Sequence, residues 1–247
     1  MKAILKRLAR AAGYRMDRWR PANRFNAMDD TLEMMSRRGF RPRVVIDAGA
    51  NVGDWTFLAT RFFPDARVHL IEPQPACRPA LDRLAAKRPS TFVHYVAISH
   101  PETDRLQFTG GSSYAGTGVH VVTAVDADVE IECPATTLDA LFASAVSRED
   151  RALLKLDLEG HELPALCGAT QLLDAIEVAI VEVQLYDINN AGVIPVFRDV
   201  YDLFERRGFE LYDVAAVGWR HRDMRLHMLD PVFVRSDSPL CADRAGT

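Results

Sequence analysis

One stretch of the sequence, VVIDAGANVGDWTF at residues 44–57, constrains the fold more than any other. Its first five residues are mostly apolar, as in a buried strand, and Gly49 and Gly53 then interrupt the pattern before a helical segment begins. A strand that passes through a glycine-containing turn into a helix is the first half of a βαβ unit. The stretch therefore predicts a mostly parallel sheet with helices packed on it.

Short apolar runs alternate with helical segments from residue 43 onward, as expected for repeated βαβ units. Strands are predicted at residues 44–48, 67–71, 92–98, 153–158, 178–183, 209–214 and 231–234. The clearest helices are predicted at residues 55–63, 76–87 and 196–207. Between the third and fourth strands, short apolar runs at residues 106–108, 119–123 and 129–133 flank a Gly- and Ser-rich segment and predict a small β-rich insert.

The length of 247 residues and the composition are those of one globular domain with short extensions. We expect a basic, helical N-terminal appendage at residues 1–40, the main domain at 41–236 and a flexible tail at 237–247. The four cysteines are widely spaced and form no C-x-x-C pair, so neither a zinc site nor a disulfide framework is indicated. The sequence shows neither a long apolar run nor a secretory signal, so we expect a cytoplasmic protein.

The charge of the chain is distributed unevenly. The first 24 residues carry eight basic side chains and one acidic one, a charge of +7, so the rest carries −11 to reach the net charge of −4. Apolar residues at positions 4, 5, 8, 11 and 12 recur at helical spacing, and such a helix either docks on the domain or contacts a membrane surface peripherally. Nucleic acid is not expected as a partner, because basic residues do not interleave with an aromatic platform in the rest of the chain.

The turn after the first predicted strand indicates the ligand. Open α/β sheets bind ligands beyond the carboxyl ends of their strands, near glycine turns and helix N-termini. The pattern here is Gly49-x-Asn51-x-Gly53, so Asn51 stands where a dinucleotide site needs its second glycine. Asp47, just before the turn, would repel a pyrophosphate but attract an ammonium group, and Glu72 ends the second strand, where a carboxylate can accept the hydroxyls of a ribose. A nucleoside that carries an amino acid and no pyrophosphate is S-adenosylmethionine.

Five blocks of the sequence resemble the FkbM family of class I S-adenosylmethionine-dependent methyltransferases. IDAGANVGDWT resembles the first motif of class I methyltransferases, and LIEPQPACRPAL resembles the acidic second-strand motif in the E-P-x-P form typical of the FkbM family. YVAISH, TTLDAL and LLKLDLEGHELPALCGA resemble three later blocks of that family. Together the blocks span about residues 43–235, and the one clear departure is Tyr95, where the family usually has asparagine.

The resemblance implies a Rossmann-like α/β fold with a seven-stranded, mostly parallel sheet, an antiparallel last strand and helices on both faces. It also implies S-adenosylmethionine as the methyl donor and a hydroxyl oxygen of a sugar, a polyketide or a related secondary metabolite as the acceptor. Carried over by position, the family's methionine pocket corresponds to Asp47, Gly49, Asn51 and Gly53, its ribose contact to Glu72, its adenine border to Ala97 and Ile98, and its contact with the donor carboxylate to Thr56.

Groups that could assist methyl transfer gather in KLDLEGHE, residues 155–162. Methyl transfer is an in-line displacement, and an alcohol acceptor benefits from a group that removes or polarises its proton. In one interpretation, Asp157 or His161 is this general base. Asp157, Glu159 and His161 are our candidate catalytic residues.

Two other interpretations of the same segment remain open. Asp157, Glu159 and Glu182 could gather a divalent metal ion, which nothing else in the sequence supports. Alternatively, Lys155 neutralises an acidic neighbour and Glu162 stabilises the first turn of a helix, so that the segment is structural.

Contacts with the acceptor are expected from residues 110–118, 186–190 and 217–223, which carry hydroxyl and aromatic side chains suited to a sugar. The leading function is an S-adenosylmethionine-dependent O-methyltransferase with a small-molecule or glycan acceptor. The alternative is a non-catalytic S-adenosylmethionine-binding module. The sequence leaves open the acceptor itself, transfer to nitrogen or carbon instead of oxygen, and assembly into a homo-oligomer.

Overall fold

The computed structural model describes residues 24–109, 120–121, 131–186, 196–220 and 222–243. Its helices are α2 (Arg24–Arg37), α3 (Asp54–Phe62), α4 (Arg78–Lys87), α5 (Leu138–Phe142), α6 (Glu162–Cys167), α7 (Leu172–Ala175) and α8 (Phe197–Arg206). Its strands are β1 (Val44–Ala48), β2 (Arg67–Ile71), β3 (Thr91–His94), β4 (Ala97–Ile98), β5 (Arg105–Thr109), β6 (His120–Val121), β7 (Ile131–Thr136), β8 (Ala152–Leu156), β9 (Ile176–Val181), β10 (Val183–Gln184), β11 (Phe209–Trp219) and β12 (Leu226–Arg235).

The main sheet has the strand order β3-β2-β1-β8-β9-β12-β11, and the short strand β10 also pairs with β12. Neighbours from β3 to β9 are parallel, whereas β12 runs antiparallel to both β9 and β11. The expected mostly parallel sheet with an antiparallel last strand is therefore confirmed. The sheet has eight strands because the chain interrupts its pairing at Glu182 and resumes as β10.

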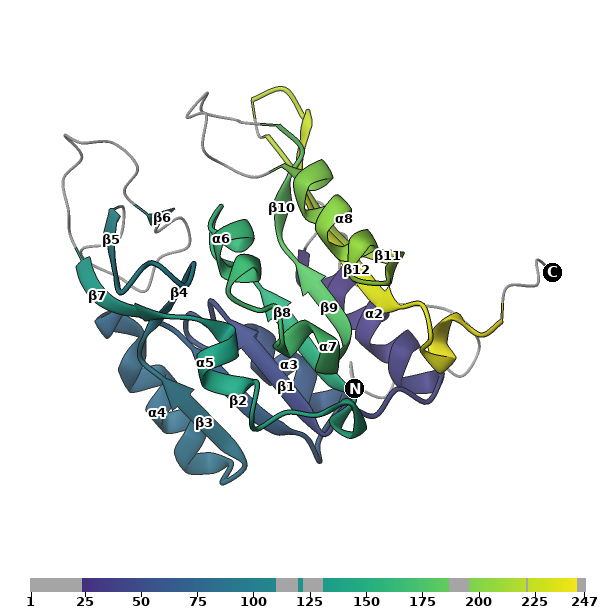
Figure 1. Ribbon diagram of the computed structural model, residues 1–247, viewed down its shortest axis with the longest axis horizontal. Coiled ribbons are helices and arrows are strands. Elements are labelled where there is room, and N and C mark those ends of the chain that lie inside the picture. Colours follow the sequence, from purple (N-terminus) through teal and green to yellow (C-terminus); the bar gives the residue numbers. More distant parts are fainter. Residues whose placement is uncertain (1–23, 110–119, 122–130, 187–195, 221, 244–247) are drawn as a thin grey trace, which may run out of the picture.

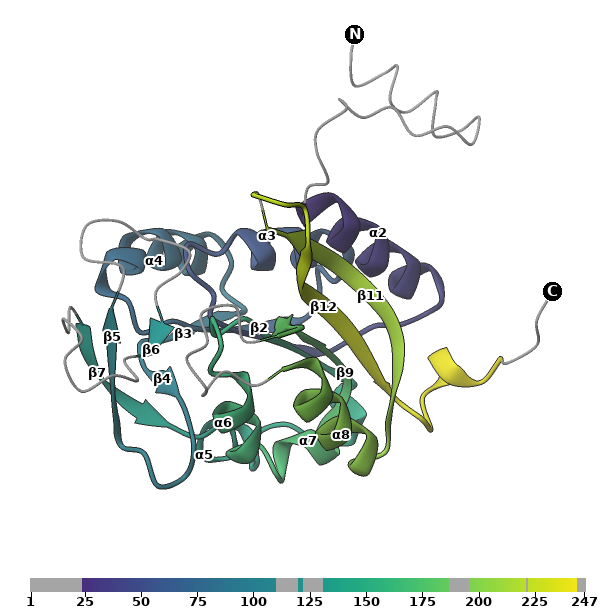
Figure 2. The ribbon, with the colours of Figure 1, turned by 90° about the horizontal axis from the view of Figure 1, so that it is seen from above.

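Helices cover both faces of this sheet, as Figures 1 and 2 show. Helices α2, α3 and α4 lie on one face and α5 to α8 on the other, and each face has its own apolar core. Every residue of β1 and β9 is buried. This double burial explains why VVIDA and IEVAIV are apolar at most positions instead of alternating.

Helix α2 belongs to the packed core. Met28, Leu32 and Met35, which share one stripe of the helix, are each at most 1% exposed. Residues 1–23 lie outside the described part, so the division into appendage, main domain and tail stays a prediction. Within the residues that the structure describes, no helix is both long and apolar enough to cross a membrane.

The predicted β-rich insert is a second sheet of order β4-β7-β5-β6. The predicted continuous strand at residues 92–98 is wrong, because β3 ends at His94 and β4 leaves the main sheet to pair with Ala135 and Thr136 of β7. This exchange of partners brings the insert to the carboxyl ends of the main strands (Figure 1). The insert therefore bounds the region where an open α/β sheet binds its ligands.

Candidate functional site

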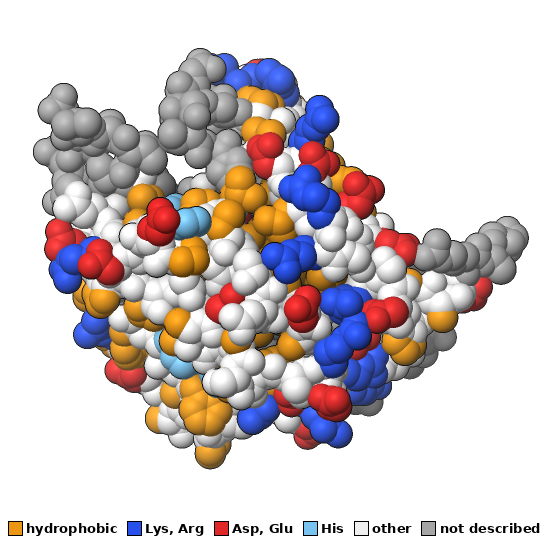
Figure 3. Space-filling view, in the orientation of Figure 1, with side chains coloured by type: hydrophobic (Ala, Val, Ile, Leu, Met, Phe, Trp, Pro, Cys, Tyr) orange, Lys and Arg blue, Asp and Glu red, His pale blue; other side chains and the backbone are white. Residues whose placement is uncertain are grey.

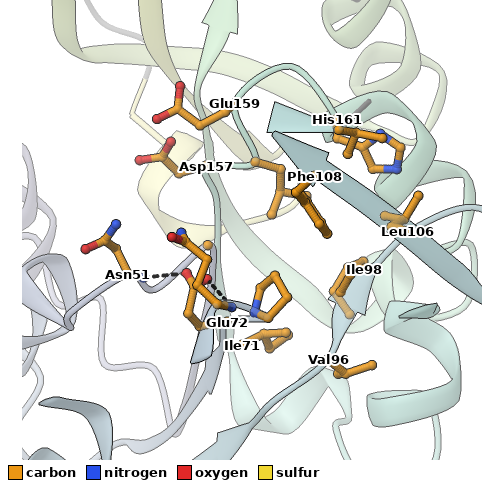
Figure 4. A pocket seen from close by; sticks show the side chains of 16 residues that line it. Asn51, Ile71, Glu72, Val96, Ile98, Leu106, Phe108, Asp157, Glu159 and His161 are labelled. Carbon is orange, nitrogen blue, oxygen red and sulfur yellow. Dashed lines mark hydrogen bonds between the residues drawn. The ribbon is translucent and has the colours of Figure 1, made fainter. Parts of the chain in front are cut away.

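A cavity opens between the carboxyl ends of β1, β2 and β8 and the insert sheet (Figure 4). Its empty volume is about 680 Å³ with the open mouth included, a size suited to a small-molecule ligand. Eight of the eleven predicted site residues line it: Gly49, Asn51, Glu72, Ala97, Ile98, Asp157, Glu159 and His161. Blocks that are more than 100 residues apart in the sequence thus meet in one wall.

The turns after β1 and β8 touch at Gly49. Its φ of +82° is a conformation that favours glycine, and a Cβ atom added there would collide with the carbonyl oxygen of Asp157. The Asp157 N–H donates to the Ala48 carbonyl over 3.0 Å, which locks the two turns together. Close packing of the chain therefore requires this glycine, whatever its contribution to ligand binding.

Glu72 is held rigidly at the cavity wall. Its two carboxylate oxygens accept hydrogen bonds from the Asn51 and Gln74 N–H groups over 2.8 and 2.9 Å (Figure 4). The side chain is only 3% exposed, and this burial raises its pKa while the two backbone donors oppose the rise. Asn51, with a φ of 47°, presents its N–H to the carboxylate from the first turn.

Asp47, Gly53 and Thr56 do not line the cavity and lie behind its wall. Asp47 is 1% exposed, and it accepts a hydrogen bond of 2.6 Å from the hydroxyl of the fully buried Thr56. Burial raises the pKa of Asp47 to about 6, against the opposing effect of Lys155. Gly53 begins α3 with a φ of 90°. Direct contact of these three residues with a cofactor stays a prediction.

The segment after β8 combines buried and cavity-lining charges. Lys155 is 2% exposed, and its ammonium group donates to Asp157 over 2.9 Å. Glu162, also 2% exposed, accepts hydrogen bonds from the Leu158 and Gly160 N–H groups over 2.8 and 3.3 Å. These contacts agree with the structural interpretation of Lys155 and Glu162. Asp157 and Glu159 nevertheless line the cavity at one end (Figure 4).

His161 has a partner that the sequence analysis missed. Ser99 Oγ lies 2.9 Å from His161 Nε2, and Ser99 is 1% exposed. Burial lowers the pKa of His161 to about 4, so the imidazole is neutral at pH 7. Ser99 directly follows Ala97 and Ile98 in the block YVAISH, and this position was the available signal.

The cavity wall opposite Asp157 and Glu159 is apolar. Leu106 and Phe108 of β5, Val121 of β6 and Ile98 of β4 come from the insert sheet. Ile71 at the end of β2 and Val96, which precedes β4, complete this wall (Figure 4). The sequence predicted acceptor contacts from residues 110–118 of the insert, which lie outside the described residues, but not that Leu106, Phe108 and Val121 line the cavity. The alternation of Leu106 and Phe108 along one strand was the signal that both face the same side. The cavity thus has an apolar end and an acidic end, with Glu72 between them.

In the part of the chain that the structure describes, no group of three or more His, Cys, Asp or Glu side chains is arranged to hold a metal ion. Asp157, Glu159 and Glu182 do not form such a group. The hypothesis of a divalent ion at these residues thus gains no geometric support from the described side chains.

The model of the methyltransferase FkbM domain matches residues 47–211, more than half of the chain. The chain belongs to the FkbM methyltransferase family. Family membership confirms the resemblance seen in the sequence and S-adenosylmethionine as the expected cofactor. No curated protein matches significantly.

Solved structures align with the chain at low sequence identity. An FkbM methyltransferase from Methylobacillus flagellatus KT aligns with a TM-score of 0.47 and 15% identity over 78% of this chain and 43% of its own. The bifunctional kinase-methyltransferase WbdD aligns with a TM-score of 0.51 and 13% identity over 86% of this chain and 39% of its own. A 1,6-didemethyltoxoflavin-N1-methyltransferase from Burkholderia thailandensis with bound S-adenosylhomocysteine aligns with a TM-score of 0.48 and 16% identity over 96% of this chain and 89% of its own. This chain spans less than half the length of the first two of these proteins.

Replacing Gly49 by alanine should cost far more stability than replacing Gly208. Both glycines have a positive φ, +82° and +78°, but an added Cβ would meet no atom within 4 Å at Gly208 and the Asp157 carbonyl at Gly49. We expect Gly208→Ala to lower the free energy of unfolding by about 1 kcal/mol and Gly49→Ala by about 3 kcal/mol or more. Urea denaturation measures both, and equal losses would show that the two turns do not need to touch.

Glu162 should make stability depend on pH. Burial raises its pKa from 4.5 to about 7, so the folded state holds the proton more tightly than the unfolded state does. The resulting stability is complete below pH 4.5 and is lost as the pH rises to about 7. Relative to Glu162→Gln, the wild type should lose on the order of 1–3 kcal/mol over this range in urea denaturation. Glu102→Gln, at an exposed carboxylate, should follow the wild type, and a Glu162→Gln curve parallel to the wild type would contradict the assignment.

Proposed function

We propose that this FkbM-family protein transfers the methyl group of S-adenosylmethionine to a hydroxyl oxygen of a sugar, a polyketide or a related secondary metabolite. The observation that carries the proposal is the polarity of this cavity, which is apolar at one end, acidic at the other and carries Glu72 between them. S-Adenosylmethionine has the same sequence of properties: a flat apolar base, a ribose diol, and a sulfonium next to an amino acid. Family membership supports methyl transfer in general.

In this proposal the adenine lies against Ile98 and the apolar side chains of the insert. Glu72 accepts hydrogen bonds from the ribose hydroxyls with the lone pairs that its two backbone donors leave available. The methionine part extends toward Gly49 and Asn51, which line the cavity at the turn after β1. Because Lys155 already compensates the charge of Asp157, Glu159 is the acidic group that we propose to stabilise the positive charge of the sulfonium and ammonium groups.

Asp157 is the base that we propose for the transfer. The acceptor oxygen attacks the methyl carbon from the side opposite sulfur, the carbon–sulfur bond breaks with its electron pair going to sulfur, and the hydroxyl proton passes to the Asp157 carboxylate. The products are S-adenosylhomocysteine and a methyl ether. Lys155 holds this carboxylate in position by its 2.9 Å contact, and Glu159 and the neutral His161 line the same wall.

Methyl incorporation into extracted metabolites tests the function directly. The purified protein is incubated with isotope-labelled S-adenosylmethionine and a whole-cell extract of small molecules and glycans, with and without a chelator, and the products are identified by mass spectrometry. A product that gains one methylene unit supports catalysis and identifies the acceptor and its methylated atom, and sensitivity to the chelator would favour a metal over a base. Tight donor binding without any product would favour a non-catalytic binding module.

Substitution of Glu72 should weaken donor binding. Glu72→Gln removes the negative charge and turns an amide NH₂ toward one of the two backbone donors, so we expect the dissociation constant for S-adenosylmethionine to rise about 10-fold or more. Isothermal titration calorimetry measures the change. Glu102→Gln removes a carboxylate outside the cavity and should bind normally. Unchanged affinity in folded Glu72→Gln would refute the ribose contact.

Substitution of Asp157 should separate binding from catalysis. Asp157→Asn keeps the shape of the side chain but removes the base, so we expect turnover to fall about 100-fold or more while donor affinity changes about 3-fold or less. Turnover is measured with the acceptor found above, and calorimetry measures donor binding. The midpoint of unfolding shows whether the protein stays stable when the buried Lys155 loses its charged partner. Retained turnover would favour the structural interpretation of Asp157.

The proposal includes a cytoplasmic enzyme that acts on small molecules or glycans and does not bind nucleic acid. Peripheral membrane contact through the basic N-terminal segment and assembly into a homo-oligomer are part of the same hypothesis. Vesicle sedimentation and light scattering test them separately from the chemistry.

A further inference from the structure

The turn between β11 and β12 packs on the segment that follows β10. The Arg225 guanidinium lies 3.8 Å from the centroid of the Tyr186 ring, and the Arg220 guanidinium lies 5.8 Å from it. The Leu185 N–H donates to the His227 carbonyl over 2.8 Å and aligns the two segments. Tyr186 and Arg220, one residue from each of two segments expected to contact the acceptor, thus lie near each other here, and residues 187–190 and 221 lie outside the described part of the chain.

This turn stands at the rim of the same sheet edge as the cavity. Leu156, the residue before Asp157, pairs with Val181, and the chain continues past Val181 through β10 to Tyr186 (Figure 1). Asp157 is therefore level with Glu182, four residues before Tyr186. At about 3.3 Å per residue, Tyr186 lies about 13 Å further along the strand direction, on the neighbouring strand about 5 Å away. A group bound at the turn would belong to a ligand roughly 15 Å long that reaches Asp157 with its other end.

The turn is positively charged on an otherwise acidic body. Residues 220–225 contain three arginines and one aspartate, a charge of +2, whereas the chain after residue 24 carries −11 in total. Basic side chains gather at the upper tip of the molecule in Figure 3, where Figure 1 places this turn. The local charge would attract an anion to the rim of the acceptor side.

Arg225 is the arginine of this turn that is available to a ligand. Arg220 engages both oxygens of Asp223, and its hydrogen bonds lower the pKa of Asp223 to about 2. Arg222 lies 3.9 Å from the same carboxylate. Arg225 is exposed, and among the described side chains no carboxylate lies within ion-pair distance of it. The Tyr186 ring covers one face of its guanidinium, and a guanidinium stacked in this way still has its in-plane N–H groups to donate.

We propose that Arg225 binds an anionic group of the methyl acceptor, a phosphate or a carboxylate, about 15 Å from the reacting oxygen. The inference rests on the proposed function and narrows its substrate class to extended anionic metabolites, such as an acidic or phosphorylated saccharide. A planar guanidinium stacked on an aromatic ring presents a pre-organised fork that matches either oxyanion.

Fractionation of the acceptor pool tests the substrate class. The extract used in the methyl-incorporation assay is separated on an anion-exchange column, and each fraction is assayed with the full-length protein. We expect the incorporated methyl in the retained, anionic fractions, and phosphatase treatment of these fractions distinguishes phosphate from carboxylate. Incorporation in the neutral flow-through would overturn the inference while leaving the proposed function intact.

Matched arginine variants test the residue. We expect Arg225→Gln to raise the KM for the retained acceptor at least 5-fold with little change in kcat, Arg225→Lys to have an intermediate effect, and Arg222→Gln to behave as the wild type. Equal effects of Arg222→Gln and Arg225→Gln would indicate diffuse attraction and contradict a specific contact.

A binding measurement decides the case in which no fraction accepts a methyl group. Ligand-observed NMR with glucose 6-phosphate, glucuronate and glucose, in the presence of S-adenosylhomocysteine, reports on anion binding directly. Binding of the two anions that Arg225→Gln weakens at least 5-fold, with none of glucose, would support the site even if the proposed catalysis failed. Equal binding of all three sugars would refute it.

Discussion

The contact between Gly49 and the backbone of Asp157 sets the geometry of the whole site. A side chain at position 49 would push apart the turns that follow β1 and β8, the two central strands of the sheet. With glycine there, the Asp157 N–H reaches the Ala48 carbonyl, and the acidic segment lies directly beside the glycine turn. The turn where we propose donor binding and the acidic segment where we propose the base line one cavity because the two turns are in van der Waals contact.

Buried charges hold the same region in a fixed arrangement. Lys155 is opposite Asp47 in the pairing of β1 with β8, and its ammonium group contacts Asp157. The buried Lys155 thus serves two carboxylates, Asp47 behind the cavity wall and Asp157 in the wall. Removing charges from water is costly, so such a group persists in the fold only where each member is positioned by partners. Glu162 plays a comparable part on the other side of the segment, where it accepts the N–H groups of Leu158 and Gly160.

The sequence predicted well the features that follow from local backbone pattern, and it predicted badly those that depend on contacts between distant residues. Gly49, Asn51 and Glu72, which the sequence grouped together, do line one cavity, because turn and strand positions follow from local pattern. The pairing of His161 with Ser99 joins residues 62 apart. The position of Ser99 after Ala97 and Ile98 places it near the site, but local pattern does not pair it with His161. The break after His94 escaped prediction because β4 is held by β7, about 40 residues later, and not by its own apolar run.

The elements around the cavity differ in how much a substitution would disturb the central sheet. The proposed donor side is built from turns of this sheet, where a side chain at Gly49 would disturb strand packing. The apolar wall and the rim come from the insert and from the β11–β12 turn, which lie outside the central strands. Side chains such as Phe108 and Arg225 can therefore change with little cost to the sheet. Acceptor preference should reside in these peripheral residues, because they alone can vary without loosening the donor site.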